Sequence, residues 1–280
     1  MKAMILAAGL GTRLRPLTDT RPKALVEVAG RTLLEITLSR LSSFGVRDVI
    51  INVHHFPDMI LDYLKAHNNF GLHIEISREE RLLDTGGGLK KASWFFLQDS
   101  STSDEPFLLH NVDVISTIDL RRMLEFHTQK QALATLAVQH RDGSRQLLFD
   151  RDLRLCGRAA PDQASDLVRG NLSSALLEGP TLQTAEANVN CHSERSEESA
   201  FRESGAGHSL PPQALAFSGI HIISPRLLRL MQEEGAFSII DTYLRLASNG
   251  EKILAFLADD AYWRDLGRPA DLARAARDLN

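Results

Sequence analysis

The segment that most constrains this chain is its N-terminus, where a short apolar strand runs into a loop rich in glycine and positive charge. The apolar run 4–8 is followed by Gly-Leu-Gly at 9–11, and then by Arg13, Arg15 and Lys23. Glycine tolerates positive φ and lacks a Cβ, so successive backbone amides can line a concave surface that binds a bulky anion. Cationic side chains beside such amides favour a ligand with several phosphates. An ordinary turn with solvated cations is the alternative, but the small residues and the number of cations favour a phosphate-binding loop.

Strand-like and helix-like segments alternate through the first half of the chain. Predicted strands cover 3–8, 48–53, 72–77, 107–112 and 132–139. Helical periodicity lies between them, at 33–41, 60–64, 89–97 and 120–126. This alternation predicts a Rossmann-like α/β fold, with a mixed, mostly parallel sheet covered by helices on both faces. Ligands of such sheets bind at the carboxyl ends of the strands, and the glycine loop falls at one of these ends.

The second half of the chain is less regular. A hairpin is predicted over 146–158, a strand over 214–223, and a helix after Ser224-Pro225, which have the residue types of an N-cap and a first turn. The remaining predicted elements are a helix over 239–247, strands over 252–257 and 262–266, and a terminal helix over 269–279. Together these segments fit a single domain over residues 1–280.

Residues 159–212 break this pattern. The middle of the segment, 191–205, is rich in serine and charge and has almost no apolar side chains. Such a composition cannot bury enough surface to offset the entropy of ordering the chain. The string also resembles a translated repeat element that recurs in unrelated bacterial proteins. We predict an inserted, largely disordered surface loop, and a regulatory or partner-binding role stays open.

The composition excludes several classes of function. The chain of 280 residues has a formal net charge of -4, which disfavours sequence-independent binding to nucleic acid. No apolar run approaches the length of a membrane span, so no membrane partner is predicted. Cys156 and Cys191 are too few for a disulfide framework or a metal cluster. They are expected to be reduced thiols, which suits a cytoplasmic protein. The oligomeric state stays open.

The N-terminal loop carries a longer motif than two glycines. It lacks the Gly-x4-Gly-Lys-Ser/Thr pattern, and Leu14 stands where a Gly-x-Gly-x-x-Gly pattern needs glycine. The segment from Leu6 to Thr18, followed by Pro22-Lys23, resembles the opening motif of the sugar-1-phosphate nucleotidylyltransferases. The resemblance implies that a nucleotide binds to this loop, with Arg13 and Lys23 as catalytic cations. The implied nucleotide-binding residues are Leu6, Ala7, Ala8, Gly9, Gly11, Thr12, Arg13 and Lys23.

Two aspartates match metal-binding motifs of the same family. Phosphoryl chemistry needs charge neutralisation, and Mg²⁺ uses one or two carboxylates together with phosphate oxygens. Asp113 ends the strand predicted after Pro106, and Asp265 lies in a Trp-Arg-Asp-Leu-Gly segment that matches Trp-x-Asp-x-Gly. Val112 stands where the family usually has glycine, which puts the approach of the phosphate in question more than metal binding. A strand-terminal cap is the alternative role of Asp113.

Two further segments resemble ligand-binding parts of the family. The sequence Asp-Thr-Gly-Gly-Gly at 84–88 is predicted to open a helix, and the resemblance places its middle residues on the nucleoside: Thr85, Gly86 and Gly87. Taken alone, a glycine triplet is as often a plain loop-to-helix junction. Asn111 and Gly219 are assigned to the sugar, although close packing alone could also require Gly219.

The implied reaction joins an NTP and a sugar 1-phosphate. An oxygen of the sugar phosphate attacks the α-phosphate, giving an NDP-sugar and pyrophosphate without a protein nucleophile. The family often has Glu-Lys-Pro near the sugar. This chain lacks Glu-Lys-Pro and in this respect resembles the short N-acetylmuramate-1-phosphate uridylyltransferases, so uridylyl transfer is slightly favoured. Guanylyl transfer to mannose 1-phosphate and thymidylyl transfer to glucose 1-phosphate stay open, as does a non-catalytic nucleotide or sugar-phosphate sensor on the same fold.

Overall fold

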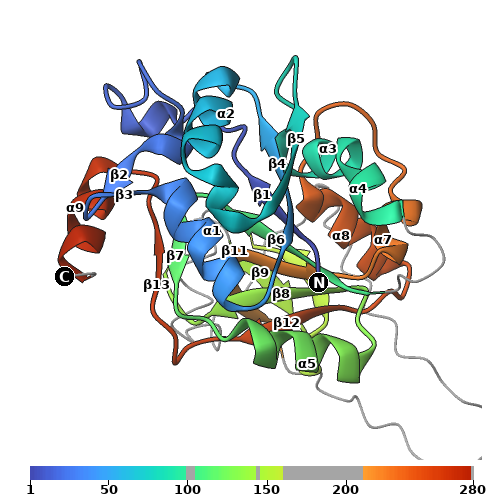
Figure 1. Ribbon diagram of the computed structural model, residues 1–280. Helices are drawn as coiled ribbons and strands as arrows, with labels where there is room; N and C mark the ends of the chain where they lie inside the picture. Colours follow the sequence, from blue (N-terminus) through green and yellow to red (C-terminus); the bar gives the residue numbers. More distant parts are fainter. Residues whose placement is uncertain (99–104, 143–145, 160–210, 279–280) are drawn as a thin grey trace, which may run out of the picture.

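A nine-stranded mixed sheet forms the centre of the computed structural model, which describes residues 1–98, 105–142, 146–159 and 211–278 (Figure 1). Its strands are β1 (Ala3–Leu6), β4 (Asp48–Val53), β5 (His73–Arg78), β6 (Phe107–Asn111), β8 (Ala134–Gln139), β9 (Gln146–Phe149), β10 (Leu155–Arg158), β11 (Gln213–Ile223) and β12 (Ile253–Leu257). The main path through the sheet runs β10-β9-β11-β6-β1-β4-β5, and β8 pairs with both β11 and β12. The predicted mixed α/β sheet is confirmed.

The parallel part of the sheet sets the position of the site. Strand β1 lies between β4 and β6 and is parallel to both. Leu6, the last residue of β1, is in register with Asn52 on one side and with Asn111 on the other. Three strands therefore end at the same edge, and the loops that leave them face one another there.

The other part of the sheet is mainly antiparallel. Strand β11 runs antiparallel to β6, β8 and β9, while β12 is parallel to β8. The register of β11 against β8 shifts between Phe217 and His221, which marks a β-bulge. A bulge bends a strand and redirects the side chains around it. This bulge lies beside the carboxyl end of β6, because Ile220 is in register with His110.

Helices cover both faces of the sheet, as predicted. One buried cluster joins α1 (Leu33–Ser43), α2 (Pro57–Ala66), α5 (Leu120–Lys130) and α9 (Pro269–Asp278) to one face of the sheet. A second cluster joins α3 (Asp84–Lys91), α4 (Ser93–Leu97), α7 (Arg226–Leu230) and α8 (Ile239–Ser248) to the other face. The alternation of β1 explains this division, since Ala3 and Ile5 belong to the first cluster and Met4 to the second.

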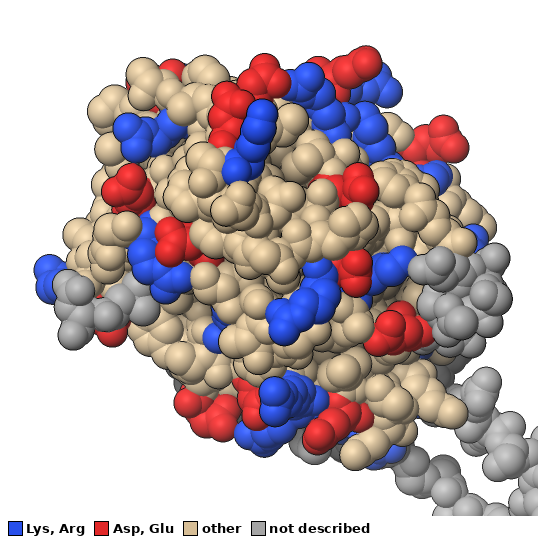
Figure 2. All heavy atoms as spheres, viewed as in Figure 1, with Lys and Arg blue, Asp and Glu red and all other residues tan. Residues whose placement is uncertain are grey.

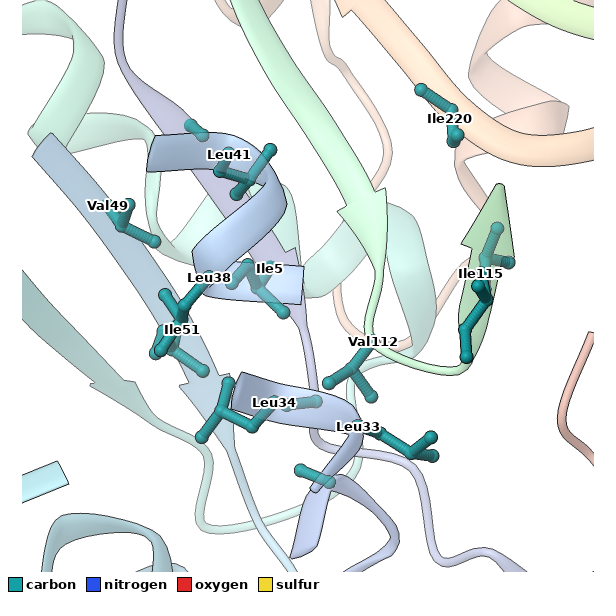
Figure 3. Packing of buried hydrophobic residues seen from close by; sticks show 14 of the residues in the cluster. Ile5, Leu33, Leu34, Leu38, Leu41, Val49, Ile51, Val112, Ile115 and Ile220 are labelled. Atoms are coloured by element: carbon teal, nitrogen blue, oxygen red, sulfur yellow. The ribbon is translucent and has the colours of Figure 1, made fainter. Parts of the chain in front are cut away.

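Helix α1 shows how the local sequence sets the packing. It begins where the Thr32 hydroxyl accepts a hydrogen bond from the Glu35 amide, which satisfies one free donor of the first turn. Leu38 and Leu41 of the helix then pack toward Ile5 and Ile51 of the sheet (Figure 3). All four side chains are fully buried. Burial of each is worth about 1.5–3 kcal/mol.

A small ribbon outside the main sheet completes the site. Strand β13 (Trp263–Asp265) pairs antiparallel with β7 (Val114–Ser116), and Asp265 is in register with Val114. Strand β7 and the short hairpin of β2 (Glu27–Val28) and β3 (Arg31–Thr32) were not predicted from the sequence. The ribbon brings a segment near the C-terminus against the loop that follows β6.

Some predicted details need correction. The helix expected over 89–97 is divided at Ala92 into α3 and α4. The helix after Ser224-Pro225 forms, but the Ser224 hydroxyl donates to the Ala132 carbonyl and makes no cap. Most of the predicted insertion 159–212, with Cys191, lies outside the described residues. Within the described part of the chain, no helix has the length and apolar character needed to cross a membrane.

Candidate active site

A cavity of about 410 Å³ lies at the carboxyl ends of β1, β4 and β6. It is lined by eleven of the predicted site residues: Leu6, Ala7, Ala8, Gly9, Gly11, Thr12, Arg13, Lys23, Thr85, Asn111 and Asp113. Six further residues complete the lining: Leu10, Asn52, Leu82, Asp84, Val112 and Gly267. Its size suits a small-molecule ligand.

The loop after β1 presents its backbone to this cavity. Gly11 has φ 65°, and a Cβ there would lie 2.8 Å from Thr18 Cγ2. The Thr18 hydroxyl donates to the Gly11 carbonyl at 2.8 Å, which holds the loop closed. Among the described residues, none accepts the amide hydrogens of Ala8 to Gly11. These amides are therefore available to an anionic ligand.

Lys23 supplies a fixed positive charge beside the loop. It begins the 3-10 helix η2 (Lys23–Leu25), and its ammonium group donates to Asp113 Oδ2. Only 10% of the Lys23 side chain and 20% of the Asp113 side chain are exposed. The pair is therefore shielded from bulk solvent, where its electrostatic interaction is stronger than on an open surface. Asp113 itself lies in the turn between β6 and β7, two residues after the end of the strand.

Asp265 joins Asp113 through the β7–β13 ribbon. The Leu266 amide donates to the Asp113 carbonyl at 2.8 Å, so the two aspartate segments are bonded directly through their backbones. Arg13 Nη2 lies 3.9 Å from Asp265 Oδ2. Gly267 makes room for the guanidinium, since a Cβ there would lie 2.5 Å from Arg13 Nη2. The ribbon thus brings together the two predicted metal ligands and one predicted catalytic cation.

The two aspartates fit a magnesium ion. Asp265 Oδ1 is buried and has no hydrogen-bond partner among the described residues. Burial, and then the nearby Asp113 carboxylate, raise the pKa of Asp265, and the positive charges of Lys23 and Arg13 partly oppose this change. The described residues contain no group of three or more histidine, cysteine or acidic side chains arranged around a metal position. Two carboxylates that leave other positions for substrate oxygens and water are typical of Mg²⁺.

The second glycine segment is arranged differently from the first. The amides of Gly86 and Gly87 both donate to the Phe237 carbonyl, at 2.9 and 3.3 Å. A Cβ on Gly86 would lie 2.3 Å from Phe237 Cε2, and one on Gly87 would lie 2.3 Å from the Gly235 carbonyl oxygen. Neither glycine lines the cavity, although Thr85 does. These glycines allow close packing of α3 against residues 235–237.

Asn111 and Gly219 lie next to each other. Gly219 is in the β11 bulge with φ 74°, and a Cβ there would lie 2.8 Å from Asn111 Nδ2. Asn111 lines the cavity and Gly219 lies behind it. Close packing against Asn111 therefore accounts for the glycine by itself.

Val112 replaces the family's usual glycine without distorting the backbone. It is not among the described residues with positive φ. Its side chain is 4% exposed and points toward Leu33 and Leu34 in the core (Figure 3). The valine therefore adds to the packing under α1, and the turn to Asp113 does not require glycine.

Arg141 supports the strand that carries Asp265. Its guanidinium stacks 3.5 Å from the centre of the Trp263 ring and donates to the Phe217 carbonyl at 2.7 Å. Burial lowers the pKa of Arg141 to about 10, and the nearby Asp265 partly opposes this change. Trp263 Nε1 donates to the Ser218 carbonyl at 2.7 Å. The ribbon is thus fixed to the β11 bulge on this side.

Asn52, Leu82 and Asp84 are cavity residues that the sequence analysis missed. The sequence does hold a signal for Asn52, because it is a polar residue near the carboxyl end of an apolar predicted strand, 48–53. Leu82 and Asp84 reach the cavity because of the way α3 packs. No local sequence pattern predicts that packing.

Charges outside the cavity are mixed. Figure 2 shows basic and acidic side chains interspersed over one face of the molecule, with no continuous basic area among the residues drawn in colour.

Cys156, the cysteine within the described residues, donates its thiol hydrogen to the Leu148 carbonyl.

Comparisons with known proteins agree with this geometry. The nucleotidyl transferase family model matches residues 2–146. An N-acetylmuramate alpha-1-phosphate uridylyltransferase from Caulobacter vibrioides is 30% identical over 98% of this chain and 96% of its own length. A mannose-1-phosphate guanylyltransferase from Mycobacterium tuberculosis is 27% identical over 99% of this chain and 64% of its own.

The fold is also that of solved relatives. The crystal structure of a putative glucose-1-phosphate thymidylyltransferase from Bacillus anthracis, in complex with a sucrose, superposes with a TM-score of 0.71. The match is 17% identical and covers 100% of this chain and 96% of the other. The family match, the full-length relative and the cavity between the phosphate loop and Asp113 lead to one assignment: the chain belongs to the nucleotidyl transferase family and is a sugar-1-phosphate nucleotidylyltransferase.

Proposed function

We propose that the enzyme transfers a uridylyl group from UTP to N-acetylmuramate α-1-phosphate and requires Mg²⁺. The observation that carries the choice of substrates is the Caulobacter uridylyltransferase, which this chain matches almost from end to end over both lengths. The guanylyltransferase from Mycobacterium tuberculosis extends well beyond the matched part. We place the reaction in the cytoplasm, where nucleoside triphosphates are made, and its product among the nucleotide sugars that supply a cell wall.

The residues around the cavity fit in-line transfer at the α-phosphate. In this proposal the amides of Ala8 to Gly11 bind the triphosphate, and Thr85 contacts the nucleoside. Arg13 and Lys23 neutralise the charge that develops on the α-phosphate and on the departing pyrophosphate. A sugar-phosphate oxygen forms the new bond to the α-phosphorus as the bond to pyrophosphate breaks, so no side chain needs to act as a nucleophile.

The carboxylates carry the metal in this proposal. Asp113 and Asp265 would hold Mg²⁺, and we assign Asn111 to the sugar phosphate. When bound, the ion supplies charge neutralisation on the phosphate oxygens. Asp265 Oδ1, buried without a partner, supports a ligand role for this residue.

A pyrophosphate-release assay tests the proposal. UTP, GTP and dTTP are each combined with N-acetylmuramate α-1-phosphate, mannose 1-phosphate and glucose 1-phosphate, with Mg²⁺ or with EDTA. We expect UTP with the N-acetylmuramate ester to give the highest kcat/KM, and EDTA to abolish release. A higher kcat/KM for GTP with mannose 1-phosphate would overturn the proposed substrates. Full activity in EDTA would overturn the metal requirement.

A further inference from the structure

A buried polar bridge connects the two loops on opposite sides of the cavity. The Ala7 amide donates to Asn52 Oδ1 at 2.8 Å, and Asn52 Nδ2 donates to Glu79 Oε1 at 2.8 Å. The Leu83 amide donates to Glu79 Oε2 at 2.9 Å. The bridge therefore runs from the start of the phosphate loop to the segment that begins α3.

The direction of each hydrogen bond in the bridge is fixed. A backbone amide can only donate, so Asn52 must turn its carbonyl oxygen to Ala7 and its amino group to Glu79. Both oxygens of the Glu79 carboxylate then accept, one from Asn52 and one from Leu83. Glu79 is also held at its own backbone, since its amide donates to the Val53 carbonyl at 2.8 Å.

Burying the bridge costs free energy, so packing alone does not explain why polar residues occupy these positions. Asn52 is 2% exposed and Glu79 is 3% exposed. A buried carboxylate costs free energy that an apolar side chain of similar size would not. Gly88 presses against the same pair, since a Cβ there would lie 2.8 Å from Asn52 Nδ2 and from Glu79 Oε1. Helix α3 therefore packs directly against the bridge at Gly88.

We propose that Asn52 and Glu79 are positioning residues that set the width of the nucleotide site. Ala7 lines the cavity on one side, and Leu82 and Asp84, the neighbours of Leu83, line it on the other. Moving either end of the bridge moves one wall relative to the other. The inference rests on the proposed function, in which the nucleotide contacts both walls. A shift of about 1 Å in the position of a bound substrate is enough to lower the rate by a large factor.

A reciprocal exchange tests the bridge. Asn52→Asp alone places two carboxylates against each other, and Glu79→Gln alone places two amino groups against each other. The double variant Asn52→Asp/Glu79→Gln restores all three hydrogen bonds, because the new carboxylate accepts from Ala7 and from the new amino group, and the new amide oxygen accepts from Leu83. Both exchanges keep the side chains nearly the same in size.

We expect each single variant to raise KM for the NTP about tenfold or more, with KM for the sugar phosphate changed less than about threefold. The double variant should return KM for the NTP to within about threefold of the original protein. His127→Gln is the matched control, because His127 is 1% exposed, bonds to Thr135 and Ser224 and does not line the cavity. It should lower Tm and leave KM for the NTP unchanged.

Several results would overturn the inference. One is a folded single variant with unchanged KM for the NTP. Another is a folded double variant whose KM for the NTP stays about tenfold above that of the original protein. This second result overturns the inference even if the single variants do not fold. Calorimetric titration with UTP, GTP and dTTP alone separates this failure from failure of the proposed function. If the original protein binds an NTP without transferring it, the same comparison is made with Kd. If it binds none, both proposals fail.

Discussion

The two glycine-rich segments at the cavity use glycine for opposite purposes. In the loop after β1, a Cβ added to Gly9 would meet no atom within 4 Å, and the amides of Ala8 to Gly11 have no acceptor among the described residues. In α3, Gly86 and Gly87 bond to Phe237 and press against residues 235–237. The first segment is open to a ligand, and the second is closed by the protein.

This difference shows what a glycine motif does and does not specify. The glycines of both segments lack side chains, and both segments lie at the edge of the sheet where ligands bind. Whether the exposed backbone meets a phosphate or another loop depends on residues far along the chain, here 235–237. Matched substitutions in the two segments should therefore separate effects on activity from effects on stability.

The largest contrast is expected between the charged groups near the first loop and the packing glycines of the second segment. Asp265→Asn should lower kcat by about a thousandfold or more, since the proposed metal loses one of two carboxylate ligands. Tm should not fall, because Asp265 Oδ1 has no partner among the described residues and burial disfavours the charged carboxylate. Steady-state pyrophosphate release and differential scanning calorimetry measure the two effects. Turnover near that of the original protein would remove Asp265 from the metal site.

A pH change should act on three buried histidines of the sheet and of α5. Burial lowers the pKa of His127 to about 4, of His110 to about 4 and of His221 to about 3, below the ordinary value of 6.5. The unfolded chain therefore binds more protons below pH 6.5, so stability present at pH 7.5 falls as the pH drops. At pH 5.5 each histidine should cost about 1.4 kcal/mol, or about 4 kcal/mol for the three together.

Urea unfolding at pH 7.5 and 5.5 measures this loss. His127→Gln should remove about a third of the pH dependence, since the three histidines contribute about equally one pH unit below 6.5. An unchanged difference between the two pH values in this variant would show that His127 is not buried in its neutral form.

The glycines themselves provide the next largest contrast. Gly86→Ala should destabilise the protein by about 1–3 kcal/mol, because the added methyl overlaps the Phe237 ring. Gly9→Ala should leave the free energy of unfolding nearly unchanged, since the space around Gly9 is open, yet it should weaken nucleotide binding by obstructing the phosphate loop. Chemical unfolding and calorimetric titration with UTP distinguish the two outcomes.

A second substitution sharpens this comparison. Phe237→Ala removes the ring overlap and leaves only the Phe237 carbonyl oxygen, 2.9 Å from the added Cβ, so Gly86→Ala should cost less stability in that background than in the original protein. Equal costs in both backgrounds would mean that Phe237 does not determine the need for glycine at position 86.

The smallest effect is expected for shortening the chain between β10 and β11. Both strands pair with β9, with Arg158 opposite Leu147 and Gln213 opposite Phe149, so the described parts of the chain before and after this segment flank one strand. A short linker can span two strand spacings of about 5 Å each. Replacing residues 188–208 by a Gly/Ser linker should leave Tm within a few degrees and the Kd for the nucleotide unchanged. Loss of folding or of nucleotide binding would show that this segment is part of the domain.

Much of the fold follows from local patterns. The apolar runs of β1, β4 and β6 and the periodicity of α1 are encoded in neighbouring residues, and so is the phosphate loop with Gly11. The sequence did not predict β7, because a strand of three residues has too little pattern to detect. The bridge from Asn52 to Glu79 and the packing of Phe237 on Gly86 join distant segments, and only the folded structure brings these together.

The ribbon of β7 and β13 has a consequence for the order of events during protein synthesis. The family match ends at residue 146, and Asp113 and Asp265 are about 150 residues apart in the chain. A ribosome adds about 5–20 residues per second, so roughly 8–30 s separate the synthesis of the two carboxylates. During that interval the nascent chain already carries the phosphate loop, Lys23 and Asp113, but not Asp265, the second proposed metal ligand. In the proposed metal site, catalysis therefore cannot begin until residue 265 has been made and the β7–β13 ribbon has formed.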